Sequence, residues 1–448
     1  MSNALQQLLA YRDAPNCYDI PVEEVRPLQI AAMNERLQDR IAKIRLVKLR
    51  ADDAGIEAVT DLADIVPLLL PHTAYKTYPE NFLLEGKWDR LTRWLGTVST
   101  YSLGDVEVEG IADVDDWIAR LHAAGHPVSC SSGTTGKSAM LVASQADLDF
   151  AAANAVAGCA WATGIAPAQD RLMFSLAPVA DVPRNHAIQG GLHSAYARPD
   201  APMFRYPVPP ITVGAITRMV ALRRAIADGT ALPSEIGEYE ATSAARQAAM
   251  DGAVDAAVEA LLAARNEKLF LIGMWGNLHK IALALRARGI GGKDFHRENM
   301  MYVGGGLKRE QLPDDYREVV RETFNVPEER NFIIYGMQEM GSTMPRCRAG
   351  RYHLAPWQVC LPLNRDGDAL LSSETGEIEG RAAFFDLSID GRWGGVISGD
   401  RIELDSRPCD CGARSPSIRD NIVRYADIAG DDKIGCAGTI DAYVRGMS

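Results

Sequence analysis

The chain of 448 residues is predicted to have an α/β fold, on three observations. Helical periodicity dominates residues 1–95. Residues 215–265 are rich in alanine with scattered charge, which favours long helices. Short apolar runs that end in turns fill much of the remaining sequence, as is typical of buried strands.

In chain order, a helix is predicted within PLQIAAMNERLQDRIAKIRLVKLRADDAG, and a second element is expected to begin at an N-cap at Thr60. Buried strands or strand ends are expected in LMFSLAPV and FRYPVPP, and a strand, a turn and a helix in EKLFLIGMWGNLHKIALALRARG. Two apolar runs enter glycine-bearing loops in ENMMYVGGGLKRE and RNFIIYGMQEMGS. Hairpin strands are predicted in ETGEIEGRAAFF and GGVISGDRIELD.

The composition excludes several classes of protein. A net charge of −12 and a pI of about 5.3 argue against a general nucleic-acid binder, because phosphate contacts need clustered Lys and Arg. No apolar run reaches the ~18–20 residues of a membrane-spanning helix, and the N-terminus lacks the basic start and apolar stretch of a signal peptide. We therefore expect a cytoplasmic protein whose eight cysteines are thiols or metal ligands rather than disulfides.

The stretch SCSSGTTGKS at 129–138 has the composition of a phosphate-binding loop, expected between a strand and a helix. It is not a Walker A loop, because Ser131 stands where that pattern needs its first glycine. Its hydroxyls can donate to phosphate oxygens, its glycines let backbone N–H groups approach, and Lys137 adds a mobile positive charge. An ordinary turn is the alternative. The residues expected to hold phosphates are Ser131, Ser132, Gly133, Thr134, Thr135, Gly136 and Lys137.

Three further loops follow in a set order, YVGGGL, YGMQEMG and SGDRIEL, and together with the first they supply what ATP needs. A triple glycine lets a flat adenine lie against the backbone, and Tyr335 offers it an aromatic face. Glu339 can hold Mg²⁺ together with Thr135, and Asp400 can accept hydrogen bonds from ribose hydroxyls. Each loop taken alone is also consistent with a plain turn or a solvated carboxylate. The glycines are Gly304, Gly305 and Gly306.

SSGTTGKS, YGMQE and SGD in this order resemble the motifs of the adenylate-forming superfamily of acyl-CoA synthetases, peptide-synthetase adenylation domains and luciferases. The resemblance covers roughly residues 65–430 and is closest to the phenylacetate-CoA ligase branch. It implies a large adenylate-forming domain with mixed sheets flanked by helices. It also implies ATP- and Mg²⁺-dependent activation of a carboxylic acid as an acyl-adenylate, followed by transfer to CoA. The branch favours an aromatic or medium-sized apolar acid.

Carried over onto this chain, the resemblance makes Lys137, Glu339 and Thr135 catalytic, and it supports the nucleotide contacts given above. Arg424 stands where the branch places a ribose-contacting arginine, although Val423 replaces the usual glycine before it.

Two further positions follow from the resemblance. Gln338 replaces the usual threonine beside Glu339. The stretch GGLHSAY at 190–196 matches a glycine-rich edge of the acyl pocket, where His193 is expected either to face the substrate or to be structural.

The cysteines give an independent signal. Cys347 and His353 precede Cys409 and Cys411, and three thiolates with one imidazole make a tetrahedral Zn²⁺ set of structural type. Some members of the branch carry such a site, and four unrelated residues are the alternative. Cys360 lies in an apolar run outside the set. The remaining cysteines are expected to fill apolar space, namely Cys17, Cys130, Cys159 and Cys436.

We expect a helical N-terminal segment at 1–95, an adenylate-forming core at 96–405, and a CxCG segment with a shortened C-terminal tail at 406–448. The superfamily ends in a mobile domain of about a hundred residues that carries a lysine, which the 24 residues after Arg424 are too few to form (448 minus 424). Lys433 is the one lysine in that tail.

Two alternatives stay open for the function. In the first, the acyl acceptor is not CoA but an amine, or the thiol of a protein or carrier. In the second, the chain is a non-catalytic nucleotide-binding scaffold. The expected partners are a small carboxylic acid, CoA or another acceptor, and a second copy in a homodimer. No nucleic acid or membrane partner is expected.

Overall fold

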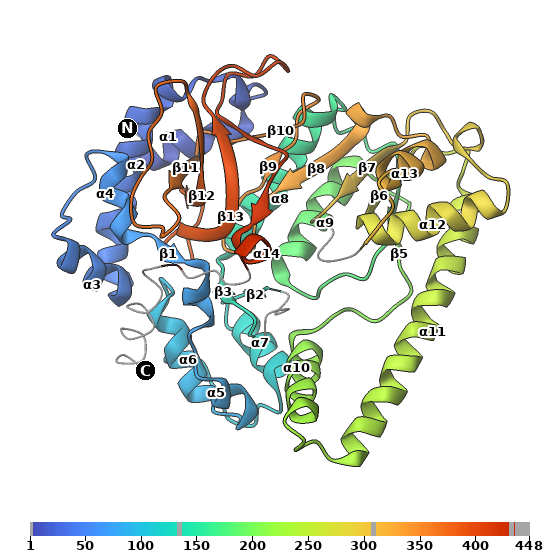
Figure 1. Ribbon diagram of the computed structural model, residues 1–448, viewed down its shortest axis with the longest axis horizontal. Coiled ribbons are helices and arrows are strands. Elements are labelled where there is room, and N and C mark those ends of the chain that lie inside the picture. The colour runs from blue at the N-terminus through green and yellow to red at the C-terminus, as the bar shows by residue number, and fades with distance from the viewer. Residues whose placement is uncertain (1–2, 132–136, 306–310, 430–433, 435–448) are drawn as a thin grey trace. The chain divides into compact units, whose positions relative to one another are not determined.

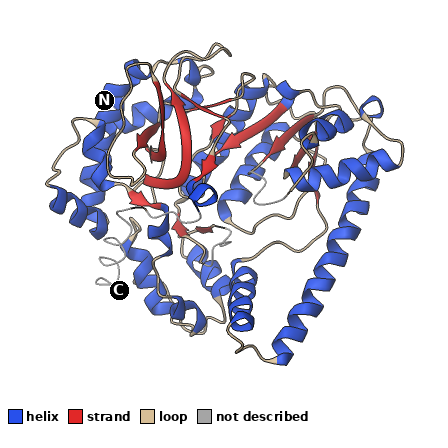
Figure 2. Cartoon of the chain, viewed as in Figure 1, coloured by secondary structure: helices blue, strands red, loops and turns tan. Residues whose placement is uncertain are grey.

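The computed structural model describes residues 3–131, 137–305, 311–429 and 434. It is a mixed α/β structure, as the sequence predicts (Figure 1 and Figure 2). The chain divides into two compact units. The first unit contains Met1–Ala157 and Gly336–Ser448, and the second contains Gly158–Tyr335, so the second unit is inserted in the sequence of the first.

Helices dominate the N-terminal part of the first unit. The longest, α2 (Val22–Lys43), has acidic residues in its first turn and basic residues in its last, which complements the helix dipole. Its apolar side recurs at helical spacing and buries Val25, Met33 and Leu37. The other helices of this unit are α1 (Ala4–Ala10), α3 (Arg45–Ala54), α4 (Leu62–Ile65), α5 (Glu80–Leu84), α6 (Trp88–Thr97), α7 (Val114–Ala123) and α14 (Tyr425–Ala429).

The predicted N-cap at Thr60 is wrong by one residue. Asp61 caps α4, because its carboxylate accepts the N–H of Ala63 at 2.9 Å. The Asp64 carboxylate accepts the backbone N–H of Thr60 at 2.7 Å and that of Asp61 at 3.0 Å. In this reciprocal capping box Asp61 is the N-cap residue, and Thr60 lies outside the helix.

The main sheet of the first unit is built around a long antiparallel pair. β12 (Glu377–Asp386) and β13 (Gly395–Asp405) pair from Glu377↔Asp405 to Phe385↔Gly395, which confirms the predicted hairpin strands. The strand order is β10-β14-β13-β12-β11, and β1 and β15 also pair with β13. The remaining strands are β1 (Leu70–Pro71), β10 (Arg351–His353), β11 (Gln358–Leu363), β14 (Ser417–Arg419) and β15 (Val423–Arg424). A short strand, β9 (Met344–Pro345), also belongs to this unit.

The segment 131–139 lies between two strands, not between a strand and a helix as expected. β2 (Val128–Cys130) and β3 (Met140–Val142) form an antiparallel pair, and α8 (Gln145–Thr163) follows only after β3. The pair is continued beyond the strands by the Ser131 N–H, which donates to the Ala139 carbonyl at 3.2 Å. The boundary between the two units falls inside α8.

The second unit contains a parallel sheet with strand order β5-β4-β6-β7-β8. Its apolar strands pack against α12 and α13 through residues such as Leu269, Leu271, Leu278 and Phe324. These strands are β4 (Leu172–Ser175), β5 (Phe204–Arg205), β6 (Leu269–Gly273), β7 (Met300–Val303) and β8 (Asn331–Tyr335). Its helices are α9 (Pro183–Tyr196), α10 (Val213–Ala227), α11 (Pro233–Ala263), α12 (Trp275–Ala287) and α13 (Tyr316–Phe324).

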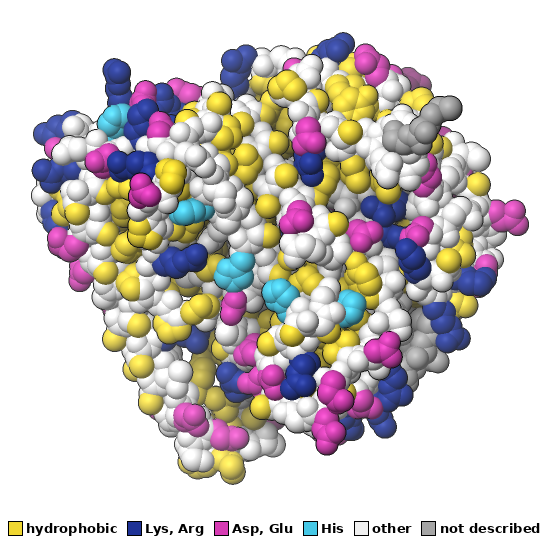
Figure 3. Space-filling model, turned by 180° about the vertical axis from the view of Figure 1, so that it is seen from behind, with side chains coloured by type: hydrophobic (Ala, Val, Ile, Leu, Met, Phe, Trp, Pro, Cys, Tyr) yellow, Lys and Arg dark blue, Asp and Glu magenta, His cyan; other side chains and the backbone are white. Residues whose placement is uncertain are grey.

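None of the helices in the described part of the chain combines the length and the apolar character that crossing a bilayer requires. Acidic and basic side chains are interspersed over the face of the molecule seen in Figure 3.

Gly394 is required where the chain turns from β12 into β13. Its φ is 93°, and a Cβ there would lie 2.7 Å from the Asp386 carbonyl oxygen. We expect Gly394→Ala to lower the free energy of unfolding by about 1–3 kcal/mol through backbone strain and this clash. Gly252→Ala, in open space on α11, should leave the melting temperature unchanged or raise it. Equal melting temperatures of the two variants by circular dichroism would contradict the prediction.

Candidate functional site

Two of the residues predicted to bind the nucleotide face each other across paired strands. Asp400 on β13 lies directly opposite Arg424 on β15 in the antiparallel register. The Arg424 Nε lies 3.7 Å from the Asp400 Oδ1. The Arg424 side chain is 67% exposed, so this ion pair contributes little to stability and leaves the guanidinium accessible.

Glu339 joins this pair from the loop that follows β8. Its carboxyl is buried, and burial raises its pKa, while the charges of Lys76 and Arg392 act in the opposite direction. The Asp400 carboxylate raises the pKa of Glu339 further, which places the two acids within electrostatic range of each other. Residues from three separate motifs are therefore brought together in the first unit.

The loop that carries Glu339 is held by a buried carboxylate that sequence reasoning missed. The Asp386 Oδ2 accepts the backbone N–H groups of Gly341 at 3.0 Å and Ser342 at 2.8 Å. The Ser342 hydroxyl donates to the same oxygen at 2.9 Å and accepts the Trp357 Nε1–H at 3.0 Å. The one sequence signal is an acidic residue at the end of an apolar strand, where an unpartnered charge would be costly.

Arg392 is a second residue that the motifs did not indicate. Its Nη2 donates to the Glu339 carbonyl at 3.2 Å and its Nη1 to the Val142 carbonyl at 2.7 Å. Its guanidinium carbon lies 6.0 Å from the centre of the Tyr75 ring. Arg392 thus connects the Glu339 loop to β3 and to the segment after β1.

Lys76 is the third residue that sequence reasoning missed. It ends the 3₁₀ helix η4 (His72–Lys76), which directly follows β1. Burial lowers its pKa, the negative charge of Glu339 raises it, and the positive charge of Arg424 lowers it. Nothing in the local sequence AYKTYP marks this lysine as functional.

The predicted phosphate loop is described only at its ends. The Lys137 Nζ donates to the Tyr78 carbonyl at 2.8 Å and lies 5.3 Å from the centre of the Tyr78 ring. The Ser131 hydroxyl oxygen accepts the Ala139 N–H at 2.8 Å. The predictions for the middle of the loop lie outside the described residues, and they concern Ser132, Gly133, Thr134, Thr135 and Gly136.

The other residues predicted to bind the nucleotide lie in the second unit. Gly304 and Gly305 follow β7, and Gly305 has a φ of 77°, which explains a glycine there. The Gly304 N–H donates to the Gly273 carbonyl at 3.2 Å. Tyr335 is the last residue of β8, and Gly306 lies outside the described residues.

His193 lies within helix α9, so the stretch 190–196 is helical rather than an extended glycine-rich edge. The His193 side chain is half-buried, and its carbonyl accepts the Ala197 N–H at 2.9 Å at the end of the helix. Its role toward a substrate stays a prediction.

The four predicted metal ligands converge in the first unit. The ligand atoms of Cys347, His353, Cys409 and Cys411 all lie within 4.8 Å of one another. The sulfurs of Cys347 and Cys409 are 3.8 Å apart, and the Cys411 sulfur is 3.6 Å from the His353 Nε2. A tetrahedral Zn²⁺ with bonds of about 2.3 Å to sulfur and about 2.0 Å to nitrogen places two sulfurs roughly 3.8 Å apart and a sulfur and a nitrogen roughly 3.6 Å apart. The observed spacings fit this ion.

The imidazole of the cluster is in the protonation state that binds a cation, whereas the thiols must lose their protons to bind one. Burial, and then the charge of Arg351, lower the pKa of His353 to about 4, so the imidazole is neutral near pH 7. Its Nδ1 lies 3.0 Å from the Ser415 hydroxyl, which leaves Nε2 facing the thiols. Burial raises the pKa of Cys411 to about 12, and a metal ion would reverse this by binding the thiolate.

The other described cysteines lie apart from this cluster. Their thiols are buried and form no disulfide, and burial raises the pKa of each well above its ordinary value. For Cys17, Cys130 and Cys159 the burial agrees with the prediction that they fill apolar space. They are Cys17, Cys130, Cys159 and Cys360, and Cys436 lies outside the described residues.

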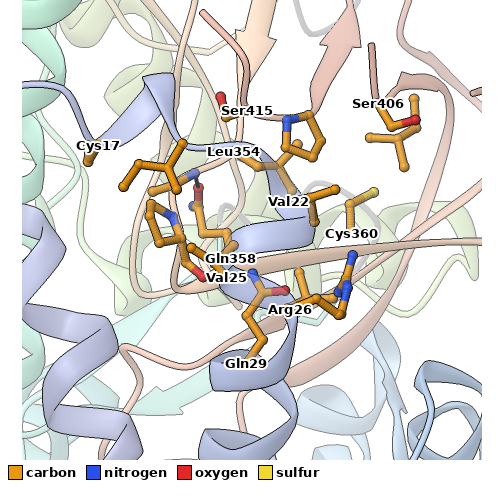
Figure 4. Close-up of a pocket in the computed structure, with 16 residues that line it drawn as sticks. Cys17, Val22, Val25, Arg26, Gln29, Leu354, Gln358, Cys360, Ser406 and Ser415 are labelled. Carbon is orange, nitrogen blue, oxygen red and sulfur yellow. Dashed lines mark hydrogen bonds between the residues drawn. The ribbon is translucent and has the colours of Figure 1, made fainter. Parts of the chain in front are cut away.

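A small cavity of about 70 Å³ lies beside α2 and β11, and none of the predicted nucleotide residues lines it (Figure 4). The side chains of Arg26 and Gln29 reach it from α2, and Ser415 lines it from the metal-cluster segment. The Arg26 Nη1 and Gln29 Oε1 atoms have no hydrogen-bond partner, so the cavity is polar at one end and suits a few water molecules. We therefore place the candidate site at Glu339 and Asp400 and not in this cavity.

Comparison with solved structures decides the fold. Two crystal structures of 2-hydroxyisobutyryl-CoA ligase in the postadenylation state match, one in complex with R3-HIB-AMP and one with 2-HIB-AMP. The TM-scores are 0.55 and 0.51, and each match has 13% identity and covers 91% of this chain and 69% of the other. The chain has the fold of an adenylate-forming ligase. No family model and no curated protein matches the sequence. At this identity the likeness establishes the adenylate-forming fold and assigns no residue a role.

In this adenylate-forming fold we expect the four-residue cluster to hold about one Zn²⁺ per chain, measured by elemental analysis of protein purified without added metal. Cys409→Ser should remove a ligand and bring the zinc content toward zero. Cys360→Ser, outside the cluster, should retain the metal.

A strong chelator should lower the melting temperature of the wild type and leave that of Cys409→Ser unchanged, because only the wild type has metal to lose. Wild-type protein without zinc and with four free thiols at these positions would contradict the metal assignment.

Proposed function

We propose that the chain activates a carboxylic acid with ATP, forming an acyl-adenylate and pyrophosphate. The observation that carries the proposal is the meeting of Glu339, Asp400 and Arg424 at one place in the first unit. These residues come from the separate YGMQE, SGD and VR segments, and an ordinary set of turns gives no reason for them to converge. The adenylate-forming fold agrees with this activity.

The chemistry explains why such a site needs these groups. A carboxylate oxygen attacks the α-phosphorus of ATP, a new C–O–P bond forms, and the bond from the α-phosphorus to pyrophosphate breaks. The ground state brings two anions together, so the site must neutralise negative charge. Asp400 would accept hydrogen bonds from the ribose hydroxyls and fix the nucleotide, with Arg424 beside it.

The residues present fit a divalent cation. Glu339 and Asp400 are two carboxylates within electrostatic range, and burial already raises the pKa of Glu339. A Mg²⁺ bound to Glu339 would offset both the burial of the Glu339 carboxylate and its repulsion by Asp400, with Thr135 as the expected second ligand. When bound, it supplies positive charge to the phosphates of ATP.

The remaining assignments belong to the same proposal. Lys137 and the hydroxyl-rich loop would hold phosphates, and the glycines after β7 with Tyr335 would receive the adenine. His193 would face the acid, which we expect to be aromatic or medium-sized and apolar. CoA is the proposed acceptor of the acyl group, and the cluster zinc would be structural.

Pyrophosphate exchange tests the function directly. A panel of carboxylic acids is offered with ATP and labelled pyrophosphate, and exchange with at least one acid is the expected result. ATP binding without exchange for any acid would support a non-catalytic scaffold instead. For an acid that exchanges, competition of CoA with amines and carrier proteins identifies the acceptor.

We expect Asp400→Ala to weaken ATP binding by ~1.5–3 kcal/mol, because the ribose loses an anionic hydrogen-bond acceptor. Calorimetry measures the loss. Asp368→Ala, in the turn after β11, provides a matched control that should bind ATP like the wild type. Unchanged ATP affinity of Asp400→Ala would remove the ribose assignment.

We expect Glu339→Gln to slow pyrophosphate exchange at least about tenfold, which corresponds to ~1.4 kcal/mol of barrier. The substitution preserves shape and removes the charge that would bind Mg²⁺. ATP affinity measured without Mg²⁺ should change little. Glu379→Gln, on β12 and paired with Arg401, is the control. Exchange at the wild-type rate would show that Glu339 is not the metal carboxylate.

A further inference from the structure

We propose that the cavity beside α2 and β11 is a binding site for bicarbonate, a small oxyanion that carries its own proton donor. The site is separate from the proposed function, because none of the described residues assigned to ATP or to the acid lines this cavity. Three features carry the proposal, namely the charge of the lining, two buried polar atoms without partners, and the volume of the cavity.

The lining of the cavity carries charge of one sign. Among the described residues that form it, Arg26 has the one charged side chain, and there is no aspartate or glutamate. Two cysteines also line the cavity, Cys17 and Cys360. Burial raises the pKa of both thiols well above the ordinary value, so they are neutral at pH 7 and do not repel an anion.

Arg26 brings a positive charge to the cavity and has no acceptor for one of its buried N–H groups. The side chain reaches the cavity from α2 (Figure 4), and its Nη1 is buried without a hydrogen-bond partner. The carboxylates of Glu23 and Asp61 act on the charge of Arg26, but neither accepts a hydrogen bond from Nη1. A planar oxyanion would satisfy this atom with a charge-assisted hydrogen bond and offset the cost of burying the charge.

Gln29 supplies a buried acceptor that lacks a donor. Its side chain is 2% exposed, and its Nε2 donates to the Pro356 carbonyl at 2.7 Å. This hydrogen bond fixes the orientation of the amide and leaves Oε1 as the buried atom without a partner.

The pair of unpartnered atoms selects the ligand. Arg26 and Gln29 are three positions apart on one helix, so their side chains are neighbours on its surface. A halide or a nitrate ion can accept from Arg26 but has no proton to donate to the Gln29 Oε1. Bicarbonate has anionic oxygens for the guanidinium and a hydroxyl for the amide oxygen, so it satisfies both.

The volume of the cavity restricts the ligand to small ions. The cavity has about 70 Å³, which at ~10–15 Å³ for each water-sized probe is room for about five water molecules or for an ion of the size of bicarbonate. ATP and aromatic or medium-sized acids are too large for it. Ile20, Val22 and Arg26 are half-buried, so the cavity borders the surface there and an ion can enter.

The test titrates the full chain with isotope-labelled bicarbonate and measures NMR line broadening near pH 8. Sodium gluconate, which is too large for the cavity, keeps the ionic strength constant. We expect saturable binding to the wild type with a dissociation constant on the order of 1–10 mM, as for an ion held by a few hydrogen bonds. Nitrate should compete at least about threefold more weakly, because it leaves the Gln29 Oε1 unsatisfied.

Two variants and a control locate the ion. Arg26→Met should weaken bicarbonate binding at least about tenfold, because it removes the charge. Gln29→Leu should weaken bicarbonate binding about three- to tenfold and change nitrate binding less than about twofold, because nitrate makes no use of Oε1. Arg45→Met, at an exposed position on α3, should bind like the wild type. Circular dichroism should show all of these proteins folded.

Crystals of the wild type soaked in sodium bromide test the anion site without any variant. Anomalous scattering from bromide beside the Arg26 Nη1 is the expected result, and a cavity that contains water alone would overturn the proposal. Bicarbonate binding that is absent from the wild type, or unchanged in Arg26→Met, would also overturn it. Gln29→Leu that binds bicarbonate as tightly as the wild type would overturn the choice of bicarbonate as the ligand.

Discussion

The Asp386 carboxylate, buried at the end of β12, determines where the candidate site can form. One of its oxygens accepts the N–H groups of Gly341 and Ser342, and the other accepts the Ser388 N–H at 3.0 Å. It therefore joins the loop after β8 to the turn between β12 and β13. A buried carboxylate with several N–H donors is strongly held, because removing it would leave those donors unsatisfied. Glu339 lies in the loop that this carboxylate holds.

A second set of buried charges holds the turn itself. Arg40 on α2 donates to the carbonyls of Arg392 at 3.0 Å and Asp390 at 2.9 Å. The Asp147 carboxylate accepts the N–H groups of Asp390 at 2.6 Å and Gly391 at 2.9 Å. Helix α2, helix α8 and the sheet thus meet at the segment that carries Arg392, whose side chain reaches the Glu339 carbonyl. The site depends on side chains that are hundreds of positions apart in the sequence.

This dependence explains what the sequence could and could not predict. Glu339, Asp400 and the four residues of the cysteine and histidine cluster could be singled out as candidates, because each lies in a short motif whose residue types suit a ligand. Asp386 and Arg392 could not, because their contacts with the Glu339 loop arise from segments that are distant in the sequence. The strand positions of the hairpin were predictable from apolar runs, whereas the surroundings of the phosphate loop were not, since a short strand such as β3 has no periodicity to read. Thr60 was misassigned because the next residue, Asp61, accepts the Ala63 N–H, while Asp64 accepts the N–H groups of Thr60 and Asp61.

The insertion of the second unit into the first has a consequence for synthesis on the ribosome. β1 pairs with β13 at Leu70↔Val396, so this early strand cannot pair until a strand more than 300 positions later has been synthesised. The second unit is one continuous stretch and can acquire its structure while the first still lacks its sheet. Until β12 and β13 emerge, apolar residues of the nascent N-terminal helices have no sheet to cover them and are exposed to aggregation or to chaperones. Release of truncated chains that end before β13 would therefore yield a folded second unit attached to an unfolded first one.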